Sequence, residues 1–282
     1  MFNITESFAN VNNIKICYEI RGDGDPVILI HGFGAKKDEW IGQFLPLSEH
    51  FKVIRFDNRG SGKSDRPNEP YTMELFAKDT NELMDFLKIE KAHIIGWSVG
   101  GMIAQNFVLM FPNRVNKLVL INTLPYWPGE NTALEMYKDS KILAYKARMK
   151  DPVKAFFDGI TPSFTRKFKK ILLEDPKKKI HGLFSAEDLM EMDNTDPTTP
   201  QDIINYTHAL GHHNVLNRLQ NIKKETLIIC ATHDRSTPMS MNVMIHERIS
   251  KSELVIIEKA GHGAPKERAP EINQHIINFL KK

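Results

Sequence analysis

The sequence has very little cysteine and no long apolar run. Only two cysteines, Cys17 and Cys230, occur in 282 residues, and each lies inside a short apolar stretch. They are therefore expected to be buried free thiols rather than a disulfide or a pair of metal ligands, which fits a reducing compartment. No stretch approaches the roughly eighteen apolar residues that a membrane-spanning helix needs, so no membrane partner is expected.

Strong charge of either sign is also missing. The 38 Lys and Arg residues and the 35 Asp and Glu residues leave a formal net charge of +3 at pH 7. This bias is too weak to indicate a nucleic-acid partner. Residues 1–10 lack both the basic start and the apolar centre of a secretory signal, so the expected location is cytoplasmic.

What the chain does have is a series of short apolar runs. Two runs, 7–11 and 14–20, are joined by Asn12-Asn13, a pair that suits a hairpin turn. Six further runs are continuously hydrophobic, which is typical of strands buried on both faces of a parallel sheet. These runs are 26–30, 51–56, 92–96, 117–121, 226–231 and 254–257.

Amphipathic helical patterns, such as 73–87 and 270–280, alternate with these runs. The alternation predicts an α/β fold with a mostly parallel, doubly wound sheet, in which ligands bind beyond the carboxyl ends of the strands. After the sixth strand, helical segments punctuated by proline replace the strand signal. We therefore expect a helical cap at 125–211, inserted into a core made of residues 1–124 and 212–282.

One predicted strand-to-helix junction carries a distinctive motif. The sequence Gly-Trp-Ser-Val-Gly at 96–100 follows the strand at 92–96 and opens an apolar helical stretch. In such a nucleophile elbow the serine, here Ser98, stands at a sharp turn, and the glycines let strand and helix approach without Cβ clashes. The helix N-terminus then favours developing negative charge. The alternative is a plain N-cap serine, which would not need glycine on both sides.

A nucleophilic serine needs a base, normally a histidine that a carboxylate orients. Eleven histidines are present. His262 is distinguished by its Ala-Gly-His-Gly loop directly after the last predicted strand, and Asp234 follows the strand at 226–231. The alternatives are a surface-loop histidine and a turn-forming aspartate. We predict that Ser98, Asp234 and His262 act together.

The loop after the strand at 26–30 supplies a candidate oxyanion hole. It reads His-Gly-Phe-Gly at 31–34, and the backbone N–H of Phe33 can donate to a developing oxyanion. The second donor would be the backbone N–H of Val99, which follows the predicted nucleophile. His31 is expected to orient this loop rather than to act as a base.

Together these motifs resemble the α/β-hydrolase family over nearly the whole chain. The resemblance is carried by 31–34, 57–65, 96–101, Asp234 and His262. Within the family, the segments 118–123, 161–164 and 234–238 are similar to the branch of 3-oxoadipate enol-lactonases and carboxylesterases. The resemblance implies hydrolysis of an ester, thioester or lactone without any cofactor.

The expected chemistry is acyl transfer to water through an acyl-enzyme on Ser98. A carbon–carbon bond hydrolase, an acyltransferase and a slow ligand-sensing protein of the same fold stay open as alternatives. We expect four residues to shape a pocket for a small or medium apolar acyl group, although such side chains are often simply the core of a cap. They are Trp97, Trp127, Met136 and Phe164.

No metal site is predicted. His208, His212 and His213 include the i, i+4 spacing of some zinc sites, but no third ligand is evident, so local packing is expected. The expected partner is a small-molecule substrate, and the chain is expected to be a monomer or a homodimer.

Overall fold

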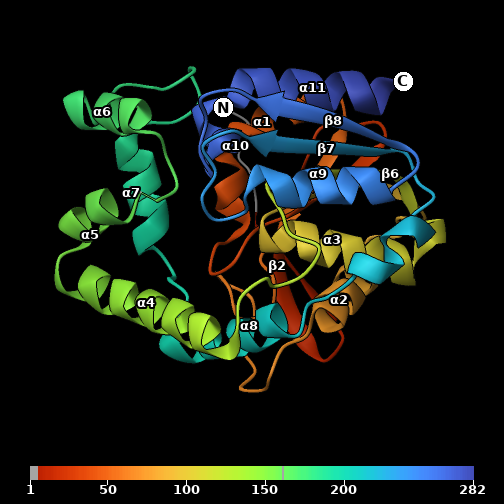
Figure 1. Cartoon of the computed structure of the whole chain (residues 1–282), viewed down its shortest axis with the longest axis horizontal. Coiled ribbons are helices and arrows are strands. Elements are labelled where there is room, and N and C mark those ends of the chain that lie inside the picture. The colour runs from red at the N-terminus through yellow and green to blue at the C-terminus, as the bar shows by residue number, and fades with distance from the viewer. Residues whose placement is uncertain (1–5, 161) are drawn as a thin grey trace.

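The computed structural model describes residues 6–160 and 162–282. Residues 1–5, which are part of the segment used to predict location, and Thr161 of the 161–164 segment lie outside the described residues. The chain folds around one eight-stranded sheet (Figure 1). Its strands are β1 (Ser7–Val11), β2 (Ile14–Arg21), β3 (Pro26–Ile30), β4 (Lys52–Phe56), β5 (Ala92–Trp97), β6 (Val115–Ile121), β7 (Thr226–Ala231) and β8 (Ser252–Ile257).

The strands lie in the order β1-β2-β4-β3-β5-β6-β7-β8. β1 and β2 form an antiparallel hairpin, β2 pairs antiparallel with β4, and all remaining neighbours in the sheet are parallel. Asn12 and Asn13 both have positive φ, 46° and 62°, as a tight hairpin turn requires. The predicted hairpin and the mostly parallel, doubly wound sheet are therefore confirmed.

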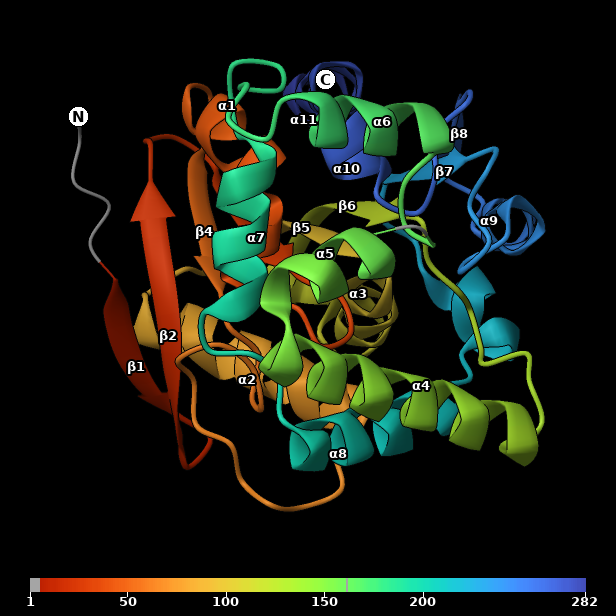
Figure 2. The same cartoon turned by 90° about the vertical axis from the view of Figure 1, so that its left-hand side faces the viewer.

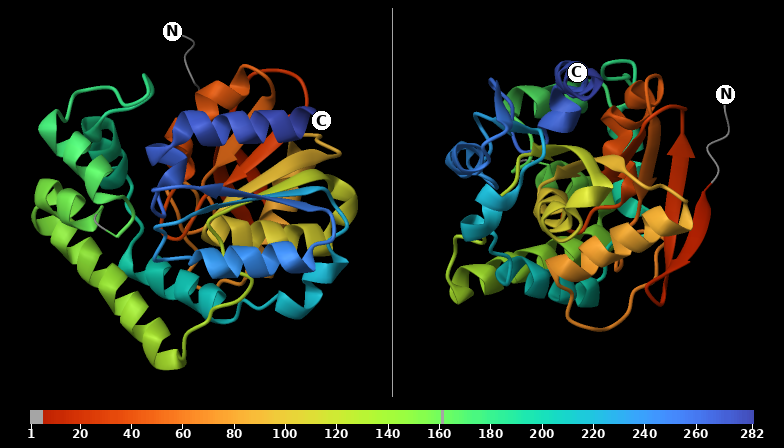
Figure 3. Two further views of the ribbon diagram at one scale, coloured as in Figure 1. Left: turned by 45° about the horizontal axis from the view of Figure 1, so that its top comes forward. Right: turned by 90° about the vertical axis from the view of Figure 1, so that its right-hand side faces the viewer.

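Helices cover both faces of the sheet, and their buried side chains belong to two separate apolar clusters. One face is covered by α2 (Met73–Phe86), α3 (Val99–Met110) and α9 (Met239–Arg248). The other is covered by η1 (Lys37–Gly42), α1 (Phe44–Ser48), α10 (Ala264–Glu267) and α11 (Ala269–Lys281). Figure 3 shows the blue α11 and the yellow α3 on opposite sides of the sheet. Two short 3₁₀ helices, η2 (Pro112–Arg114) and η3 (Leu216–Asn221), complete this part of the chain.

Further helices lie between β6 and β7, where the cap was predicted. They are α4 (Asn131–Lys150), α5 (Pro152–Gly159), α6 (Arg166–Glu174), α7 (Ala186–Asn194) and α8 (Pro200–Gly211). Pro152 and Pro200 begin two of them, because the first helical turn tolerates a missing N–H. In Figure 1 they lie on the side toward which the arrows of β7 and β8 point. The division of the chain at 125 and 211 stays a prediction, and none of the described helices is long and apolar enough to span a membrane.

Both cysteines are buried and unpaired, as their apolar surroundings predicted. Cys17 lies in β2 and Cys230 in β7. Burial raises the pKa of the Cys17 thiol to about 12 and that of the Cys230 thiol to about 11. Both thiols therefore stay protonated and unreactive near neutral pH.

Buried histidines make the stability of this fold depend on pH. Burial lowers the pKa of His31, and it lowers the pKa values of His93 and His213 to about 4. In the unfolded chain these imidazoles bind protons below about pH 6.5. Because His93 and His213 stay neutral in the fold down to about pH 4, protons bind preferentially to the unfolded chain in this window. Stability is therefore lost as the pH falls from about 6.5 toward 4.

We expect the free energy of unfolding to be on the order of 3 kcal/mol lower at pH 5 than at pH 6.5, from His93 and His213 alone. Urea unfolding at both pH values measures the difference. His213→Asn should remove roughly half of it. His212 is the exposed neighbour, so His212→Asn is the matched control. Identical pH dependence in the two variants would contradict this origin.

Candidate active site

Ser98 stands between β5 and α3 in a strained backbone conformation, with φ 58° and ψ −122°. The glycines around it are sterically required. A Cβ at Gly96 would lie 2.2 Å from the carbonyl oxygen of Gly100, and a Cβ at Gly100 would lie 2.0 Å from that of Ile30. Strand and helix therefore approach as closely as the sequence motif predicted, and Ser98 is held at the sharp turn.

Hydrogen bonds to the backbone of Ser98 fix this turn to the end of β6 and the residues just after it. The Ser98 N–H donates to the carbonyl oxygen of Ile121 at 3.0 Å, and the Thr123 hydroxyl donates to the carbonyl oxygen of Ser98 at 2.7 Å. Both backbone polar groups of Ser98 are thus satisfied, the N–H by the last residue of β6 and the carbonyl oxygen by Thr123 and by N–H groups of α3. These contacts keep Ser98 in its unfavourable backbone conformation.

His262 and Asp234 meet at the ends of β7 and β8. His262 Nδ1 lies 2.8 Å from Asp234 Oδ2, and the carboxylate side chain is fully buried. Asp234 Oδ1 also accepts hydrogen bonds from the N–H groups of Ser236 and Thr237, and Oδ2 accepts one from the Thr237 hydroxyl at 2.6 Å. Because an ionised carboxylate only accepts, the proton belongs on His262 Nδ1, which leaves Nε2 as a free acceptor.

The loop of His262 is tied to the strands that carry Ser98. Trp97 Nε1 donates to the carbonyl oxygen of His262 at 3.2 Å, and Asn122 Nδ2 donates to the same oxygen at 3.0 Å. The Trp97 and His262 rings are 5.9 Å apart. Within the described residues the Ser98 hydroxyl makes no hydrogen bond, so the structure brings His262 beside the elbow without closing a bond to Ser98. Such bonds often tighten only when substrate is bound.

Two backbone donors stand beside Ser98. The His31-Gly32-Phe33-Gly34 loop passes close to it, since a Cβ at Gly32 would lie 3.3 Å from Ser98 Cβ. In the described part of the chain, neither the Phe33 N–H nor the Val99 N–H has a hydrogen-bond partner. Val99 is the first residue of α3, where N–H groups have no partner inside the helix.

His31 holds the loop in place. Its Nε2 accepts a hydrogen bond from the Asn58 N–H at 3.0 Å, so Nδ1 carries the proton and donates it to the carbonyl oxygen of Gly32 at 2.9 Å. Burial lowers the pKa of this imidazole, which keeps it neutral. These contacts support the expected orienting role of His31.

The four predicted pocket residues lie in different surroundings. Phe164 packs over the His262 loop, because a Cβ at Gly263 would lie 2.3 Å from its ring. The Trp127 ring lies 5.7 Å from the Tyr137 ring at a tilt of 54°, and the Tyr137 ring lies 5.3 Å from that of Phe33. Trp97 is only 7% exposed, so it supports His262 and offers little surface to a substrate.

Met136 corrects the sequence prediction. It is 73% exposed, and it lies on the side of α4 away from Leu134 and Tyr137, which pack against the core. Met136 points about 200° around the helix from Leu134 and about 100° from Tyr137, so it does not share their inward face. The structure therefore does not bring Met136 into the candidate site.

The cap is tied directly to the loop that carries His262. The Gly263 N–H donates to the carbonyl oxygen of Ser163 at 2.7 Å. The buried carboxylate of Glu267 accepts hydrogen bonds from the Gly261 N–H at 3.2 Å and from the hydroxyl of Thr165. A shift of this cap segment would therefore displace the loop that carries His262.

Three positioning residues were missed by sequence reasoning: Asn122, Thr237 and Glu267. A signal existed for two of them. Asn122 directly follows the sixth strand, at the carboxyl edge where polar residues collect, and Thr237 lies three residues after Asp234. Nothing in the local pattern around Glu267 predicts its contact with Thr165, because the two are 102 positions apart.

Asn122 joins the acid loop to the histidine loop. Its side chain accepts from the Ala231 N–H and donates to His262. We expect Asn122→Ala to lower the free energy of unfolding by about 2–4 kcal/mol and kcat by about a hundredfold. Asn122→Asp keeps the acceptor for Ala231 but sets a buried carboxylate against the carbonyl oxygen of His262, so it should lower kcat and cost at least as much stability as Asn122→Ala. Urea unfolding and ester turnover measure both effects.

Asn116→Ala is the matched control, because Asn116 lies on the same strand and is exposed. It should leave both quantities unchanged. Equal activity in wild type and Asn122→Asp would contradict the positioning role.

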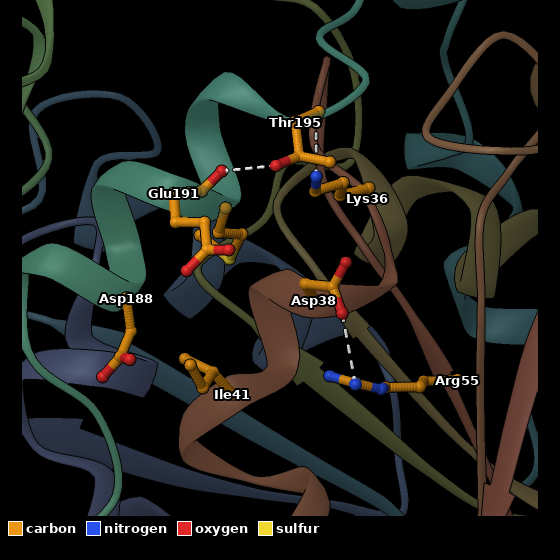
Figure 4. Close-up of a pocket in the computed structure, with 8 residues that line it drawn as sticks. Lys36, Asp38, Ile41, Arg55, Asp188, Glu191 and Thr195 are labelled. Carbon is orange, nitrogen blue, oxygen red and sulfur yellow. Dashed lines mark hydrogen bonds and ion pairs between the residues drawn. The ribbon is translucent and has the colours of Figure 1, made fainter. Parts of the chain in front are cut away.

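A charged pocket lies away from these residues. It has a volume of about 270 Å³ and lies between α7 and the η1 region (Figure 4). It is lined by Lys36, Asp38, Ile41, Arg55, Asp188, Glu191, Met192 and Thr195. A smaller pocket, of about 40 Å³, reaches Gly34 and Ala35 beside the candidate oxyanion loop. Ser98, Asp234 and His262 line neither pocket.

The chain is similar to known proteins over nearly its whole length. A family model described as alpha/beta hydrolase fold matches residues 25–269. A Caulobacter segnis protein provisionally named as a carbamate hydrolase is 26% identical over 272 residues, which are 94% of this chain and 96% of that protein. An enol-lactonase from Burkholderia xenovorans LB400 aligns with a TM-score of 0.83 and 25% identity, covering 98% of this chain and 100% of that one. A bromoperoxidase from Bacillus anthracis, 24% identical with a TM-score of 0.82 over 99% and 100% of the chains, shares the fold.

Proposed function

The chain belongs to the alpha/beta hydrolase fold family, and from that premise we propose that it is a serine hydrolase in which Ser98 is the nucleophile. The substrate class is a carboxylic ester, thioester or lactone with a small to medium apolar acyl group. One observation carries the proposal above all. Ser98 sits in a strained turn with φ 58°, while the Asp234–His262 pair, 2.8 Å apart, is fastened beside it.

The proposed reaction has two halves. Ser98 Oγ attacks the substrate carbonyl carbon while His262 Nε2 takes its proton, and the imidazolium returns that proton to the leaving alcohol or thiol. Water then loses a proton to His262 and attacks the acyl-enzyme, which releases the acid and restores Ser98. Asp234 keeps Nδ1 protonated and stabilises the imidazolium.

The oxyanion formed in each half would be held by the N–H groups of Phe33 and Val99. Both are backbone donors at fixed positions, and Val99 adds the positive end of the α3 dipole. Preorganised donors of this kind need no reorientation when charge develops.

Substrate choice rests on the cap and on the relatives. Phe164 lies against Gly263 next to His262, which favours an apolar acyl group near the reacting carbonyl. A similar chain is an enol-lactonase, so lactones belong in the first substrate panel. A cytoplasmic location stays a prediction.

A fluorophosphonate probe tests the proposal at the level of one residue. Ser98 Oγ would attack the phosphorus and fluoride would leave, with the serine proton passing to His262. Trypsin then releases residues 92–114, a peptide in which Ser98 is the only hydroxyl-bearing residue. We expect the mass of the probe, less hydrogen fluoride, to be added to this peptide and to no other.

The same preparation is assayed with p-nitrophenyl esters of increasing acyl length and with simple lactones. Turnover that is highest for short and medium acyl chains supports the substrate class. A label on a different peptide, or an unlabelled protein without turnover, would overturn the proposal and favour a ligand-sensing role. Labelling with transfer of the acyl group to an added alcohol, and no hydrolysis, would replace hydrolase by acyltransferase.

A further inference from the structure

The long helix α4 presents an outer face that the fold does not use. None of its 20 residues is buried. Met136 and Leu143 are 73% and 67% exposed, and residues seven apart lie on the same side of a helix. The opposite side holds α4 to the molecule, through the partly buried Leu134 and Tyr137, which pack against the core, and through the pairing of Arg148 with Asp193. In Figure 2, α4 crosses the front of the molecule and no element covers it.

Small side chains lie beside these two apolar residues. Ala133, Ser140 and Ala147 are all exposed on the neighbouring flank of α4. Small residues let a second helix approach closely. Single exposed apolar side chains are ordinary on a protein surface, so the apolar face alone does not identify a partner.

The charges on the other flank of α4 favour a second copy of this chain as the partner. Glu135, Asp139, Lys146 and Lys150 are exposed, and at 100° per residue they fall within an arc of about 60°. When two copies of a helix pack antiparallel around a twofold axis, this flank meets the same flank of the other copy. The acidic half of each helix would then face the basic half of the other.

The register of these charges fits a single twofold axis. Glu135 is as far before the midpoint between Ile142 and Leu143 as Lys150 is beyond it. Asp139 and Lys146 are related through the same midpoint. Both charge pairs therefore form in one alignment, which also places Leu143 at the centre of the interface. Glu135 pairs with Lys138 on the same helix, whereas Asp139, Lys146 and Lys150 form no salt bridge among the described residues.

We propose that two copies of this chain associate through antiparallel α4 helices, with Leu143 at the centre, Met136 on the same face nearer the end of each helix, and the Asp139–Lys146 and Glu135–Lys150 pairs along one edge. The inference is independent of the activity proposed for Ser98. One helix pair buries less surface than the roughly 1,200 Å² of a standard stable interface. The dimer is accordingly weak and forms only at high protein concentration.

Sedimentation velocity over a range from low to several hundred micromolar protein tests the interface. Wild type should move from monomer toward dimer as the concentration rises. Leu143→Glu should abolish the shift, because it places two like charges at the centre. Leu173→Glu changes an equally apolar, exposed residue on α6 and should leave association intact. Circular dichroism confirms that each variant keeps its helices.

A charge exchange tests the antiparallel register. Lys146→Glu sets two carboxylates against each other at both symmetry-related positions, so it should weaken association at least tenfold, by about 1.4 kcal/mol. Adding Asp139→Lys to the same chain reverses both partners and should restore dimerisation. Failure of the double variant to recover would overturn the register.

Three other outcomes would overturn the proposal. Wild type that stays monomeric at every concentration leaves no interface to explain. A dimer that survives Leu143→Glu must use another surface. A changed KM in Leu143→Glu with unchanged sedimentation would mean that this face borders the route of the substrate instead.

Discussion

Ser98→Ala is expected to lower kcat/KM for p-nitrophenyl esters by about a millionfold, leaving only the residual catalysis of binding and the oxyanion donors. The loss is so large because alanine cannot form the acyl-enzyme, and His262 then has no adjacent hydroxyl to activate. The fold should not suffer, since the Ser98 hydroxyl makes no hydrogen bond among the described residues. The free energy of unfolding should therefore change by no more than about 0.5 kcal/mol.

Stopped assays with long incubation measure the residual rate, and urea unfolding measures stability. Ser250→Ala is a matched control, because Ser250 is exposed and lies after α9. It should keep full activity. If Ser98→Ala retained more than about a hundredth of the wild-type activity, Ser98 would not be the nucleophile.

Asp234→Asn is expected to lower kcat by about ten-thousandfold. An asparagine has nearly the same shape and can still accept from the Ser236 and Thr237 N–H groups, so the loop should stay in place. The amide, however, can present its NH₂ group to His262 Nδ1. The imidazole proton would then move to Nε2, which is the atom that must accept the proton of Ser98.

The kinetics of a double variant show whether Ser98 and Asp234 act together or independently. Residues that act as a unit are strongly non-additive, so Ser98→Ala combined with Asp234→Asn should be no slower than Ser98→Ala alone. Asp23→Asn, at an exposed position before β3, is the control for the chemical change itself. A loss of less than about tenfold in Asp234→Asn would exclude Asp234 as the partner of His262.

The sheet was predictable because its signal is local. Strands buried on both faces read as continuous apolar runs, and the runs at 26–30 and 226–231 match β3 and β7 residue for residue. The residues at which the strands begin and end were less predictable. β8 begins at Ser252 rather than at Leu254, because backbone pairing with β7 extends the strand beyond its apolar part.

Some residues of the candidate site could likewise be predicted from local patterns, and others could not. Ser98 could be found from five consecutive residues, since the elbow needs glycines at fixed offsets. Asp234 and His262 could be found from their places after strands. Met136 could not be judged, because a helix with a weak amphipathic pattern does not reveal which face turns inward.

The elements, the sharp turn at Ser98 and the order of the three candidate residues along the chain could be predicted from the residues alone, because short-range sterics and hydrophobic periodicity decide these features. Which distant groups meet depends instead on how the elements pack together. Asn122 joins the loops of Ala231 and His262, and Glu267 joins Gly261 to Thr165. Such contacts depend on how the strands are ordered and how the cap packs, and no local pattern encodes the distance between residues so far apart in the chain.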